Sequence, residues 1–574
     1  MNTRPLILYF GSFNPVHSGH IAVAEAALRH FDGAADLWFM LSACNPFKTE
    51  AGMWPDERRW ALLNEALAGR AGMRACDMEL HLPRPSYTVH TLERVRAQEG
   101  TARPLYLLMG EDNLEKFTAW RSFETILDWC RVLVYPRVNA EPRLPGALAA
   151  YANRFILLRG ALLPQNSTAI RGQALIGHTP EDWAKCLQWR RAQAEALREA
   201  AREVKLATVG PQVYLRGLIE YSNICRKNCY YCGIRSGNPS VSRYAVAEAE
   251  VLAAVENAYR AGFGSIVLQS GERQDAAFID TIERLLKEIA RLSDGQLGVT
   301  LSLGEQTLET YSRWRAAGAT RYLLRIETSN PALYAQLHPE DHRFDERIKA
   351  LEALKAADYM VGSGVMIGLP GQTEADLAGD LAFFRDFGID MVGMGPYIEH
   401  RDTPLYARRN EIPTLAERYE LSLNMLALLR IIMPTLNMAA STAMASLHPQ
   451  GREAALRIAA NVIMPNITPG RYRENYFLYE NKLCICESEQ DAKDRIETLV
   501  RSAGCELRYF EKGDPKHYYD RVVGPAPVAP RPIPSETATK SCNGFSRNAV
   551  GLSPTAPVAP IDNKPDGVDH FKTL

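Results

Sequence analysis

The segment Asn223–Arg235 reads NICRKNCYYCGIR, and its three cysteines decide how the larger part of the chain is interpreted. Cys225, Cys229 and Cys232 follow the spacing C-x3-C-x2-C within one short polar stretch. Three thiolates cannot complete a tetrahedral zinc site by themselves, whereas a 4Fe-4S cluster held by three cysteines leaves one iron open to a small chelating ligand. The spacing alone also allows zinc with a remote fourth ligand, or a cluster that only transfers electrons.

Apolar runs on both sides of this segment predict a barrel. The run Val213–Ile219 precedes the cysteines, and five further runs follow, each ending in polar residues: SIVLQSGE (265–272), GVTLSLGE (298–305), RYLLRIETS (321–329), YMVGSGVMIGLP (359–370) and DMVGMGPYIE (390–399). Helical periodicity separates them, and the strand starts recur about every 30 to 40 residues, as in a (β/α) barrel. Catalytic groups of such barrels lie at the C-terminal strand ends, which is where we expect Gln269, Ser302, Arg325, Glu327 and Met366.

With Tyr231 before the last cysteine, the loop resembles that of the radical S-adenosylmethionine (SAM) enzymes. The resemblance implies that SAM chelates the open iron, and that one electron cleaves its C5′–S bond to give a 5′-deoxyadenosyl radical, which a barrel mouth protects. More specifically, residues 208–520 resemble the HydE-type FeFe-hydrogenase maturases through the strings EYSNICRKNCYYCGIR, VLQSGE, VTLSLGE, RYLLRIETSNP, IGLPGQT, DMVGMGPYIEHRDTPL, STAM, GRE and ANVIMPNITP.

The HydE resemblance carries expectations about residues and partners. It implies SAM cleavage during assembly of the hydrogenase diiron subcluster, acting on an iron-carbonyl-cyanide precursor, with ferredoxin or flavodoxin as reductant and other hydrogenase maturases as partners. Cys225, Cys229 and Cys232 would bind the cluster, and SAM would contact Tyr231, Gln269, Ser302, Glu327 and Arg347. The alternative for Glu327 and Arg347 is a structural ion pair. We interpret Cys484 and Cys486 as packing residues, so we expect only one iron-sulfur cluster.

The N-terminal part shows a second site. A strand-like run, Leu6–Phe10, leads into GSFNPVHSGH (11–20), and a helical pattern follows from Ile21 to Arg29. Further apolar runs at 37–41, 105–109, 132–135 and 155–158 alternate with helical stretches, which predicts a Rossmann-like parallel sheet. His17 and His20 would stand at the start of the first helix, where backbone N–H groups and the helix dipole favour a polyphosphate. An HxxH pair alone is common, so the prediction of a nucleotide site depends on its position in a strand–turn–helix segment.

Other segments at matching distances complete a resemblance. They are NPFK (45–48), RPSYTVHTLE (84–93), MGEDNLEKFTAW (109–120), YPR (135–137) and QNSTAIRG (165–172). With GSFNPVHSGH they resemble nicotinate-nucleotide adenylyltransferases, the nicotinate mononucleotide-specific HxGH nucleotidyltransferases, over residues 5–175. The resemblance implies transfer of AMP from ATP, with Mg2+, to nicotinate mononucleotide, releasing pyrophosphate. No side-chain nucleophile is needed, because the mononucleotide phosphate attacks the α-phosphorus while the protein positions groups and stabilises charge.

Site residues of the N-terminal part follow from that resemblance. The catalytic set would be His17, His20, Lys48 and Arg171. The substrate and ATP contacts would come from Gly11, Ser12, Phe13, Thr88, Asp112, Trp120, Arg137, Ser167 and Thr168. Trp120 has a core position as its alternative. Asn166 stands where the family has serine, so this sequence departs from the family's pattern in the phosphate clamp.

The organisation predicted from these patterns has four parts: a nucleotidyltransferase domain (1–178), a helical connector (179–205), a radical SAM barrel of TIM type (206–521) and a disordered Pro- and Ala-rich tail (522–574).

The chain of 574 residues is 46% hydrophobic, with 66 Lys and Arg against 67 Asp and Glu. A net charge of −1 gives no global attraction to nucleic acid or an anionic membrane. Its eleven cysteines are mostly isolated, so we expect a reducing cytoplasm rather than a disulfide framework.

Three hypotheses of function remain at this point. The first is a bifunctional enzyme that joins an adenylyltransferase to a radical SAM maturase. The second keeps the barrel but gives it the substrate of a methylornithine synthase or biotin synthase, although no cysteines suited to the auxiliary cluster of biotin synthase are found in the barrel. The third is a non-catalytic iron-sulfur assembly scaffold with a nucleotide-binding head. The most apolar helical stretch, 421–441, is interrupted by Asn424, Arg430 and Pro434, so we expect no transmembrane helix, and we expect no secretory signal peptide in the N-terminal residues.

Overall fold

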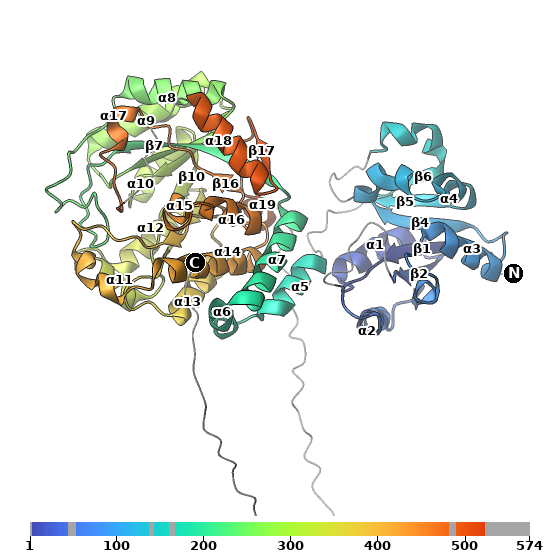
Figure 1. The fold of residues 1–574 in the computed structure, drawn as a ribbon. Coiled ribbons are helices and arrows are strands. Elements are labelled where there is room, and N and C mark those ends of the chain that lie inside the picture. The colour runs from blue at the N-terminus through green and yellow to red at the C-terminus, as the bar shows by residue number, and fades with distance from the viewer. Residues whose placement is uncertain (1–2, 44–52, 137–142, 160–166, 481–488, 523–574) are drawn as a thin grey trace, which may run out of the picture. The chain divides into compact units, whose positions relative to one another are not determined.

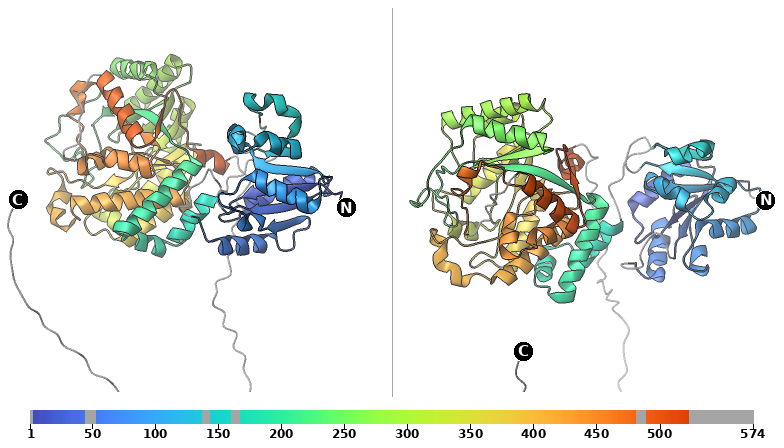
Figure 2. Two further views of the ribbon diagram at one scale, coloured as in Figure 1. Left: turned by 45° about the vertical axis from the view of Figure 1, so that its right-hand side comes forward. Right: turned by 45° about the horizontal axis from the view of Figure 1, so that its top comes forward.

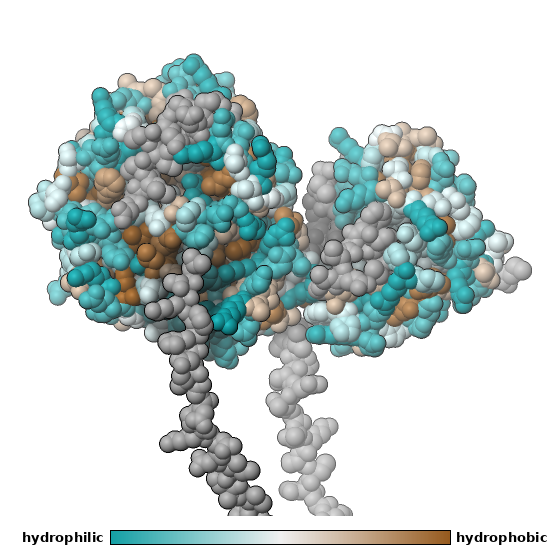
Figure 3. All heavy atoms as spheres, in the orientation of Figure 1, coloured by the Kyte–Doolittle hydropathy of each residue, from teal (hydrophilic) through white to brown (hydrophobic). Residues whose placement is uncertain are grey.

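The computed structural model describes residues 3–43, 53–136, 143–159, 167–480 and 489–522, which form an N-terminal sheet domain and a larger barrel domain (Figures 1 and 2). The surface visible in Figure 3 is mostly hydrophilic, with hydrophobic residues gathered in a few groups. No helix in these ranges is long and apolar enough to cross a membrane. Cys484, Cys486 and the tail from 523 onward lie outside the described residues.

The N-terminal domain is a six-stranded parallel sheet in the order β3-β2-β1-β4-β5-β6. Its strands are β1 (Leu6–Gly11), β2 (Asp36–Leu41), β3 (Met73–Cys76), β4 (Leu105–Gly110), β5 (Arg131–Tyr135) and β6 (Phe155–Leu157). Alternate residues of β1 enter two separate hydrophobic clusters, one on each face of the sheet, because successive strand side chains point to opposite sides. The strand order reverses between β1 and β4, and in such sheets ligands bind beyond the carboxyl ends at that point.

Helices cover both faces of this sheet. They are α1 (Ser18–Arg29), α2 (Asp56–Leu67), α3 (Thr88–Glu99) and α4 (Phe123–Trp129), together with the 3-10 helices η1 (Met78–His81), η2 (Glu111–Ala119) and η3 (Gly146–Arg154). The five apolar runs expected to be strands are confirmed, and the Rossmann-like prediction holds. The sequence reading missed β3, whose residues MRAC carry no apolar run.

The barrel domain closes from eight parallel strands. Their order is β15-β13-β11-β10-β9-β8-β7-β16, and a parallel bridge from Ala439 to Val462 joins the two ends. The strands are β7 (Gln212–Ser222), β8 (Ser265–Ser270), β9 (Gly298–Ser302), β10 (Ala319–Leu323), β11 (Met360–Ser363), β13 (Met391–Val392), β15 (Asn437–Met438) and β16 (Val462–Ile463). The short pair β12 (Met366–Ile367) and β14 (Gly395–Pro396) continues two of them. The predicted (β/α) barrel is therefore confirmed.

The outer layer of the barrel is helical (Figure 1). It contains α8 (Glu248–Arg260), α9 (Ala276–Leu292), α10 (Leu308–Ala316), α11 (Pro331–Leu337), α12 (Phe344–Ala356), α13 (Glu374–Phe387), α14 (Leu415–Ile432), α15 (Thr442–Leu447), α16 (Gly451–Ile458), α17 (Gly470–Arg473) and the 3-10 helix η4 (Pro404–Glu411). Trp314 of α10 is fully buried beneath α9, where its indole N–H donates to the carbonyl of Ile279 at 3.1 Å. Burial of one face of each amphipathic helix holds this layer on the strands.

C-terminal residues close the amino-terminal end of the barrel. The strand β17 (Glu506–Arg508) pairs with the start of β7, after α18 (Glu489–Ser502) and before α19 (Lys516–Val522). Between β17 and α19, Asp514 pairs with the fully buried Arg321, and the carbonyl of Gly513 accepts from Arg216 at 2.8 Å. Both arginines lie inside the barrel, so this segment compensates part of their charge.

The segment expected to be a helical connector contains two helices. Residues 179–205 form α6 (Pro180–Leu187) and most of α7 (Arg191–Thr208), with a break at Gln188–Arg190. Thr179 and Asp182 make a capping box at the start of α6. The side chain of Asn424 donates to the carbonyls of Leu187 and Trp189, which satisfies acceptors that the break leaves outside a helix. Arg190 donates to the same two carbonyls at 3.1 and 3.0 Å, so a local side chain and a tertiary contact from α14 together satisfy the break.

Candidate functional site

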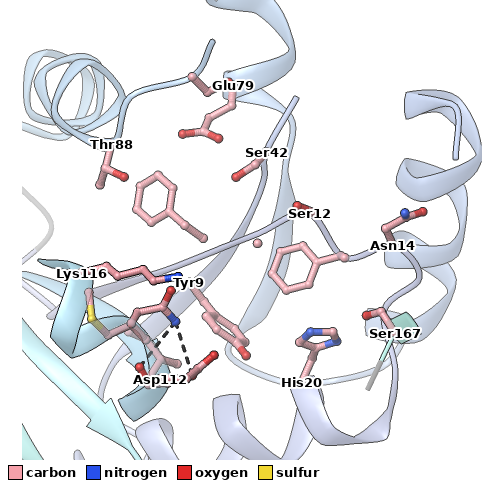
Figure 4. Close-up of a pocket in the computed structure, with 18 of the residues that line it drawn as sticks. Tyr9, Ser12, Asn14, His20, Ser42, Glu79, Thr88, Asp112, Lys116 and Ser167 are labelled. Carbon is pink, nitrogen blue, oxygen red and sulfur yellow. Dashed lines mark hydrogen bonds between the residues drawn. The ribbon is translucent and has the colours of Figure 1, made fainter. Parts of the chain in front are cut away.

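A cavity of about 1330 Å³ lies beyond the carboxyl ends of β1 and β4. Its lining includes most of the site residues expected in the N-terminal part: Gly11, Ser12, Phe13, His20, Thr88, Asp112, Trp120, Ser167, Thr168 and Arg171. Figure 4 shows Glu79, Ser42 and Thr88 toward one end, and His20, Asn14 and Ser167 toward the other. Lys48 and Arg137 lie outside the described residues.

The two histidines are organised by the start of α1. His17 is the N-cap residue, and its backbone N–H donates to Nδ1 of His20 at 3.2 Å. The two rings stack with centroids 3.8 Å apart. Because Nδ1 of His20 accepts a hydrogen bond, its proton is placed on Nε2, which can donate to a phosphate oxygen. The helix start adds backbone N–H groups and positive dipole charge.

The turn after β1 is tightly built. Phe13 has a φ of +39°, in the left-handed region, and its ring packs edge-on against His20 with centroids 5.1 Å apart. A Cβ on Gly11 would lie 2.8 Å from that ring, so only glycine fits there. The buried Oγ of Ser12 has no hydrogen-bond partner among the described residues, which leaves it available to a ligand.

Buried Arg59 fixes this turn from behind. Its guanidinium donates to the carbonyls of Ser12 at 2.6 Å and Ser42 at 2.9 Å, and it also pairs with Asp56. The sequence reading missed Arg59, because an arginine in a charged helix start gives no sign of burial. It also missed Glu79, which lines the cavity 2% exposed and accepts from Thr91 at 2.8 Å. Burial raises the pKa of the Glu79 carboxyl.

The phosphate-clamp residues stand on α5 (Ser167–Ile176). Ser167 Oγ donates to the carbonyl of Pro15 at 3.0 Å, and Arg171 Nη1 donates to the carbonyl of Asn14 at 2.8 Å. Arg171 Nη2 also contacts Thr168 Oγ1 at 3.3 Å. These bonds bring the clamp and the GSFNPVHSGH turn together, as the resemblance implies. Trp120 is half-buried, and its ring lies 5.2 Å from that of Phe117, so it borders both cavity and core.

The three clustered cysteines occupy the loop after β7, at the carboxyl end of the barrel strands. Cys225 accepts from the backbone N–H of Glu272 at 3.4 Å, and Cys229 lies 3.9 Å from Nδ1 of His342. Burial raises the pKa of Cys229 to about 12, and it also raises the pKa values of the other two thiols. The nearby thiols add to this effect, because a thiolate disfavours another negative charge.

These cysteines fit an iron-sulfur cluster. Among the described residues, no three His, Cys, Asp or Glu side chains are close enough to hold a single metal ion. In a cluster each cysteine binds a different iron, so such a set is wider than the ligand set of one ion. The three thiols share one loop and remain close enough to influence one another's pKa.

Of the five expected SAM residues, Tyr231 belongs to this loop, and Gln269, Ser302 and Glu327 lie at or just beyond the carboxyl ends of β8, β9 and β10. Tyr231 OH lies 3.5 Å from Nε2 of His338, Gln269 donates to Tyr476 OH at 3.4 Å, and Ser302 ends β9. Glu327 has a φ of +65° and is held by Arg325, whose Nε lies 3.0 Å from both carboxylate oxygens. A non-glycine residue in that conformation costs free energy, and such strain collects at functional sites.

Arg347, the fifth, belongs to a buried network beside the same loop, and it also donates to the carbonyl of Arg325. It donates to Glu305 Oε1 at 2.6 Å, and Lys227 Nζ donates to the other oxygen of Glu305 at 2.8 Å. Glu272 lies 3.7 Å from Lys227. The alternative of a Glu327–Arg347 ion pair is therefore wrong, because each residue has another partner. The sequence reading missed Lys227, Glu272 and Glu305 as site residues, although the two glutamates end predicted strand segments.

The charges of this network shape its titration. Burial opposes ionisation of Glu305, but the charges of Arg347 and Lys227 outweigh it and lower its pKa to about 2. Burial, together with the neighbouring Glu305, raises the pKa of Glu272. Lys227 stands between Cys225 and Cys229, so the network holds the middle of the cysteine loop.

Comparisons with known proteins agree with this geometry. The family model of the Radical SAM superfamily matches residues 219–384, and the Cytidylyltransferase-like model matches residues 8–172. The chain is 46% identical over 296 residues to the [FeFe] hydrogenase maturase subunit HydE of Thermotoga maritima, a match that covers 51% of this chain and 82% of that protein. The radical SAM family implies a 4Fe-4S cluster and SAM as cofactors.

The N-terminal part has its own relatives. It is 46% identical over 130 residues to the protein named "Probable nicotinate-nucleotide adenylyltransferase" of Bacteroides fragilis, covering 23% of this chain and 64% of that protein. It is 38% identical over 134 residues to that of Cytophaga hutchinsonii, covering 23% of this chain and 69% of that protein.

Solved structures support the barrel fold. Methylornithine synthase (PylB) matches with a TM-score of 0.51 at 23% identity, covering 59% of this chain and 97% of its own. The hydrogenase maturase HydG matches with a TM-score of 0.50 at 22% identity, covering 59% and 75%. At these identities the likeness concerns the fold alone. Through the sequence relatives of its two parts, the chain belongs both to the nicotinate-nucleotide adenylyltransferases and to the HydE-type proteins of the radical SAM superfamily.

Proposed function

We propose that the chain is a bifunctional enzyme whose N-terminal site transfers AMP from ATP to nicotinate mononucleotide, giving deamido-NAD and pyrophosphate. The observation that carries this proposal is the meeting of the His17–His20 helix start with the Arg171 clamp at one cavity. His20 Nε2, Ser12 Oγ and Arg171 would hold the ATP phosphates, with Mg2+, Lys48 and Arg137 adding positive charge. These groups stabilise charge in the transition state, and the mononucleotide phosphate is the nucleophile.

The other end of the cavity would receive the mononucleotide. Thr88 and Trp120 would hold and stack the pyridine ring, and Asp112 would contact a ribose, since all three line the cavity. The test is an assay of pyrophosphate release by the full chain with ATP and nicotinate mononucleotide. The nicotinamide mononucleotide reaction is the specificity control. A chain that binds ATP without turning over either mononucleotide would be a nucleotide-binding head only.

For the barrel we propose radical SAM chemistry in maturation of the FeFe-hydrogenase H-cluster, with an iron-carbonyl-cyanide precursor as substrate. The three cysteines in one loop at the mouth of a closed barrel carry this proposal. Cys225, Cys229 and Cys232 would hold one 4Fe-4S cluster, which supplies the electron for cleavage of SAM. Glu327, Gln269, Ser302 and Tyr231 would orient SAM, and the surrounding barrel excludes water.

Anaerobic reconstitution with iron and sulfide, followed by dithionite and SAM, tests the barrel. Formation of 5′-deoxyadenosine supports the proposal, and a C229A variant provides the matched negative control. A cluster that forms but leaves SAM intact would favour an assembly scaffold. Stimulation of 5′-deoxyadenosine formation by the hydrogenase precursor, but not by lysine or dethiobiotin, would separate maturation from methylornithine synthase or biotin synthase chemistry.

The expected partners follow from these reactions. We propose ferredoxin or flavodoxin as the electron donor and the other hydrogenase maturases as assembly partners. We also place both activities in a reducing cytoplasm, in keeping with the free thiols of Cys76, Cys130, Cys186 and Cys505.

A further inference from the structure

The helix that carries the phosphate clamp is built into the helical layer of the barrel domain. α5 packs against α7 and α14, and Figures 1 and 2 show α5, α6 and α7 side by side. Ile176, at the end of α5, is 2% exposed and belongs to the same hydrophobic cluster as the barrel strands. A Cβ on Gly172 would meet Val204 of α7 at 3.0 Å and Ile431 of α14 at 3.1 Å, so the helices approach closely there.

α7 also borders the nucleotide cavity. Glu203, Leu206 and Ala207 line it beside Thr168 and Arg171 of α5. Leu206 is 41% exposed, so α7 presents an apolar side chain to the cavity beside the carboxylate of Glu203. None of these three residues belongs to a motif of the nucleotidyltransferase resemblance, which ends at about residue 175.

One contact ties α7 to the clamp chemically. Glu203 Oε2 accepts from Arg171 Nη2 at 3.3 Å, with side-chain exposures of 38% and 19%. Arg171 Nη2 also contacts Thr168, while Nη1 donates to the Asn14 carbonyl. The three acceptors, on Asn14, Thr168 and Glu203, fix the plane of the Arg171 guanidinium. Since a planar guanidinium binds phosphate only in matching orientation, the group that sets this plane governs how well Arg171 meets ATP.

We propose that Glu203 is a positioning residue of the nucleotide site, supplied by the barrel domain, which orients Arg171 toward the ATP phosphates. The proposal rests on the proposed adenylyl transfer and extends it, because the barrel then completes the site of the smaller domain. Arg171 retains its charge when Glu203 is replaced and loses only its alignment. The expected defect is therefore confined to the ATP side of the reaction.

The experiment compares full-length E203A, E203D and E203Q with E199A. Glu199 provides a matched control, because it forms an ion pair of 3.0 Å with Arg202 on the same helix and does not line the cavity. Steady-state kinetics are measured for both substrates, ATP affinity is measured by calorimetry, and urea unfolding reports on folding. For E203A we expect kcat/KM for ATP to fall about two- to fivefold, the range of a partly exposed ion pair. Partial recovery is expected in E203D.

Selectivity distinguishes positioning from a structural role. The KM for nicotinate mononucleotide, the unfolding midpoint and SAM cleavage should match those of the unmodified chain. If E203A equals E199A in kcat/KM for ATP, or if both substrates and the unfolding midpoint change together, the role of Glu203 is overturned. An unmodified chain that neither binds ATP nor releases pyrophosphate would refute the proposed reaction itself, and the role of Glu203 with it.

Discussion

Replacing Glu305 by glutamine tests the charge balance of the barrel mouth. The Glu305 carboxylate lies between Arg347 and Lys227, which lower its pKa from an ordinary value of 4.5 to about 2. At 1.36 kcal/mol for each pH unit, this difference corresponds to about 3 kcal/mol of folding free energy. The side chain is only 12% exposed, so solvent screens little of it. We expect E305Q to lower the free energy of unfolding of the barrel by about 3 kcal/mol at neutral pH.

The pH dependence follows from the direction of the shift. Because the folded-state pKa is lower than the unfolded one, the stabilisation is fully present above pH 4.5 and is lost as the pH falls toward 2. The difference between the unmodified chain and E305Q should therefore be constant from pH 7 to 6 and about 0.8 kcal/mol smaller at pH 4.

Urea unfolding of the metal-free chain, followed by circular dichroism, measures this difference. E309Q is the control, since Glu309 is an exposed carboxylate on the neighbouring helix α10. Lys227 lies within the cysteine loop, so E305Q should also hold less iron after reconstitution than E309Q. Equal stability of the two variants, or a difference that does not change with acid, would refute the assignment of the network as stabilising.

Three further outcomes are expected. H20A should lower kcat for adenylyl transfer by about 10²–10³ and leave SAM cleavage unchanged in the same preparation, because one preorganised donor is lost. E327Q should weaken SAM binding about tenfold in equilibrium titrations, whereas E340Q, at an exposed glutamate, should bind as the unmodified chain does. W314A should lower the unfolding free energy by about 3–5 kcal/mol, because it empties a fully buried site and removes the indole hydrogen bond to the carbonyl of Ile279.

Hydrophobic periodicity predicted the layers of the fold but not all of their boundaries. The runs 265–272 and 298–305 contain β8 and β9, since buried parallel strands are continuously apolar. The run 359–370 is divided between β11 and β12, and β3 was not predicted because its four residues include the exposed Arg74 and none of them is fully buried. At the break after α6, the carbonyls of Leu187 and Trp189 accept from the nearby Arg190 and also from Asn424, a residue more than 200 positions away whose contribution no local pattern contains.

The site was predictable where one short segment holds several functional groups. The cysteine loop and the GSFNPVHSGH turn are of this kind, because spacing in the chain fixes spacing in the structure. The ion pairs between charged residues that lie far apart in the sequence were not predictable in this way. Arg325 stands two residues before Glu327 and reaches it directly, so Arg347 is left to Glu305 on another strand end. The sequence shows that charges gather at the barrel mouth, but the register between strands decides which of them meet.

Both sites place positive charge before the ligand arrives, although they do so differently. In the N-terminal cavity, His20 and the helix start offer donors on a tight turn, while Arg171 comes from a helix packed on the barrel. Because the phosphate-binding groups come from two different parts of the chain, phosphate binding depends on the packing of α5 against α7 and α14. In the barrel mouth the three cations Arg325, Arg347 and Lys227 already face the carboxyl groups of Glu327, Glu305 and Glu272, and burial keeps the free thiols neutral. Negative charge from the cysteines therefore develops only with iron, whose charge compensates it. The fused chain thus joins a site open to anions with one that is electrically balanced until its cluster forms.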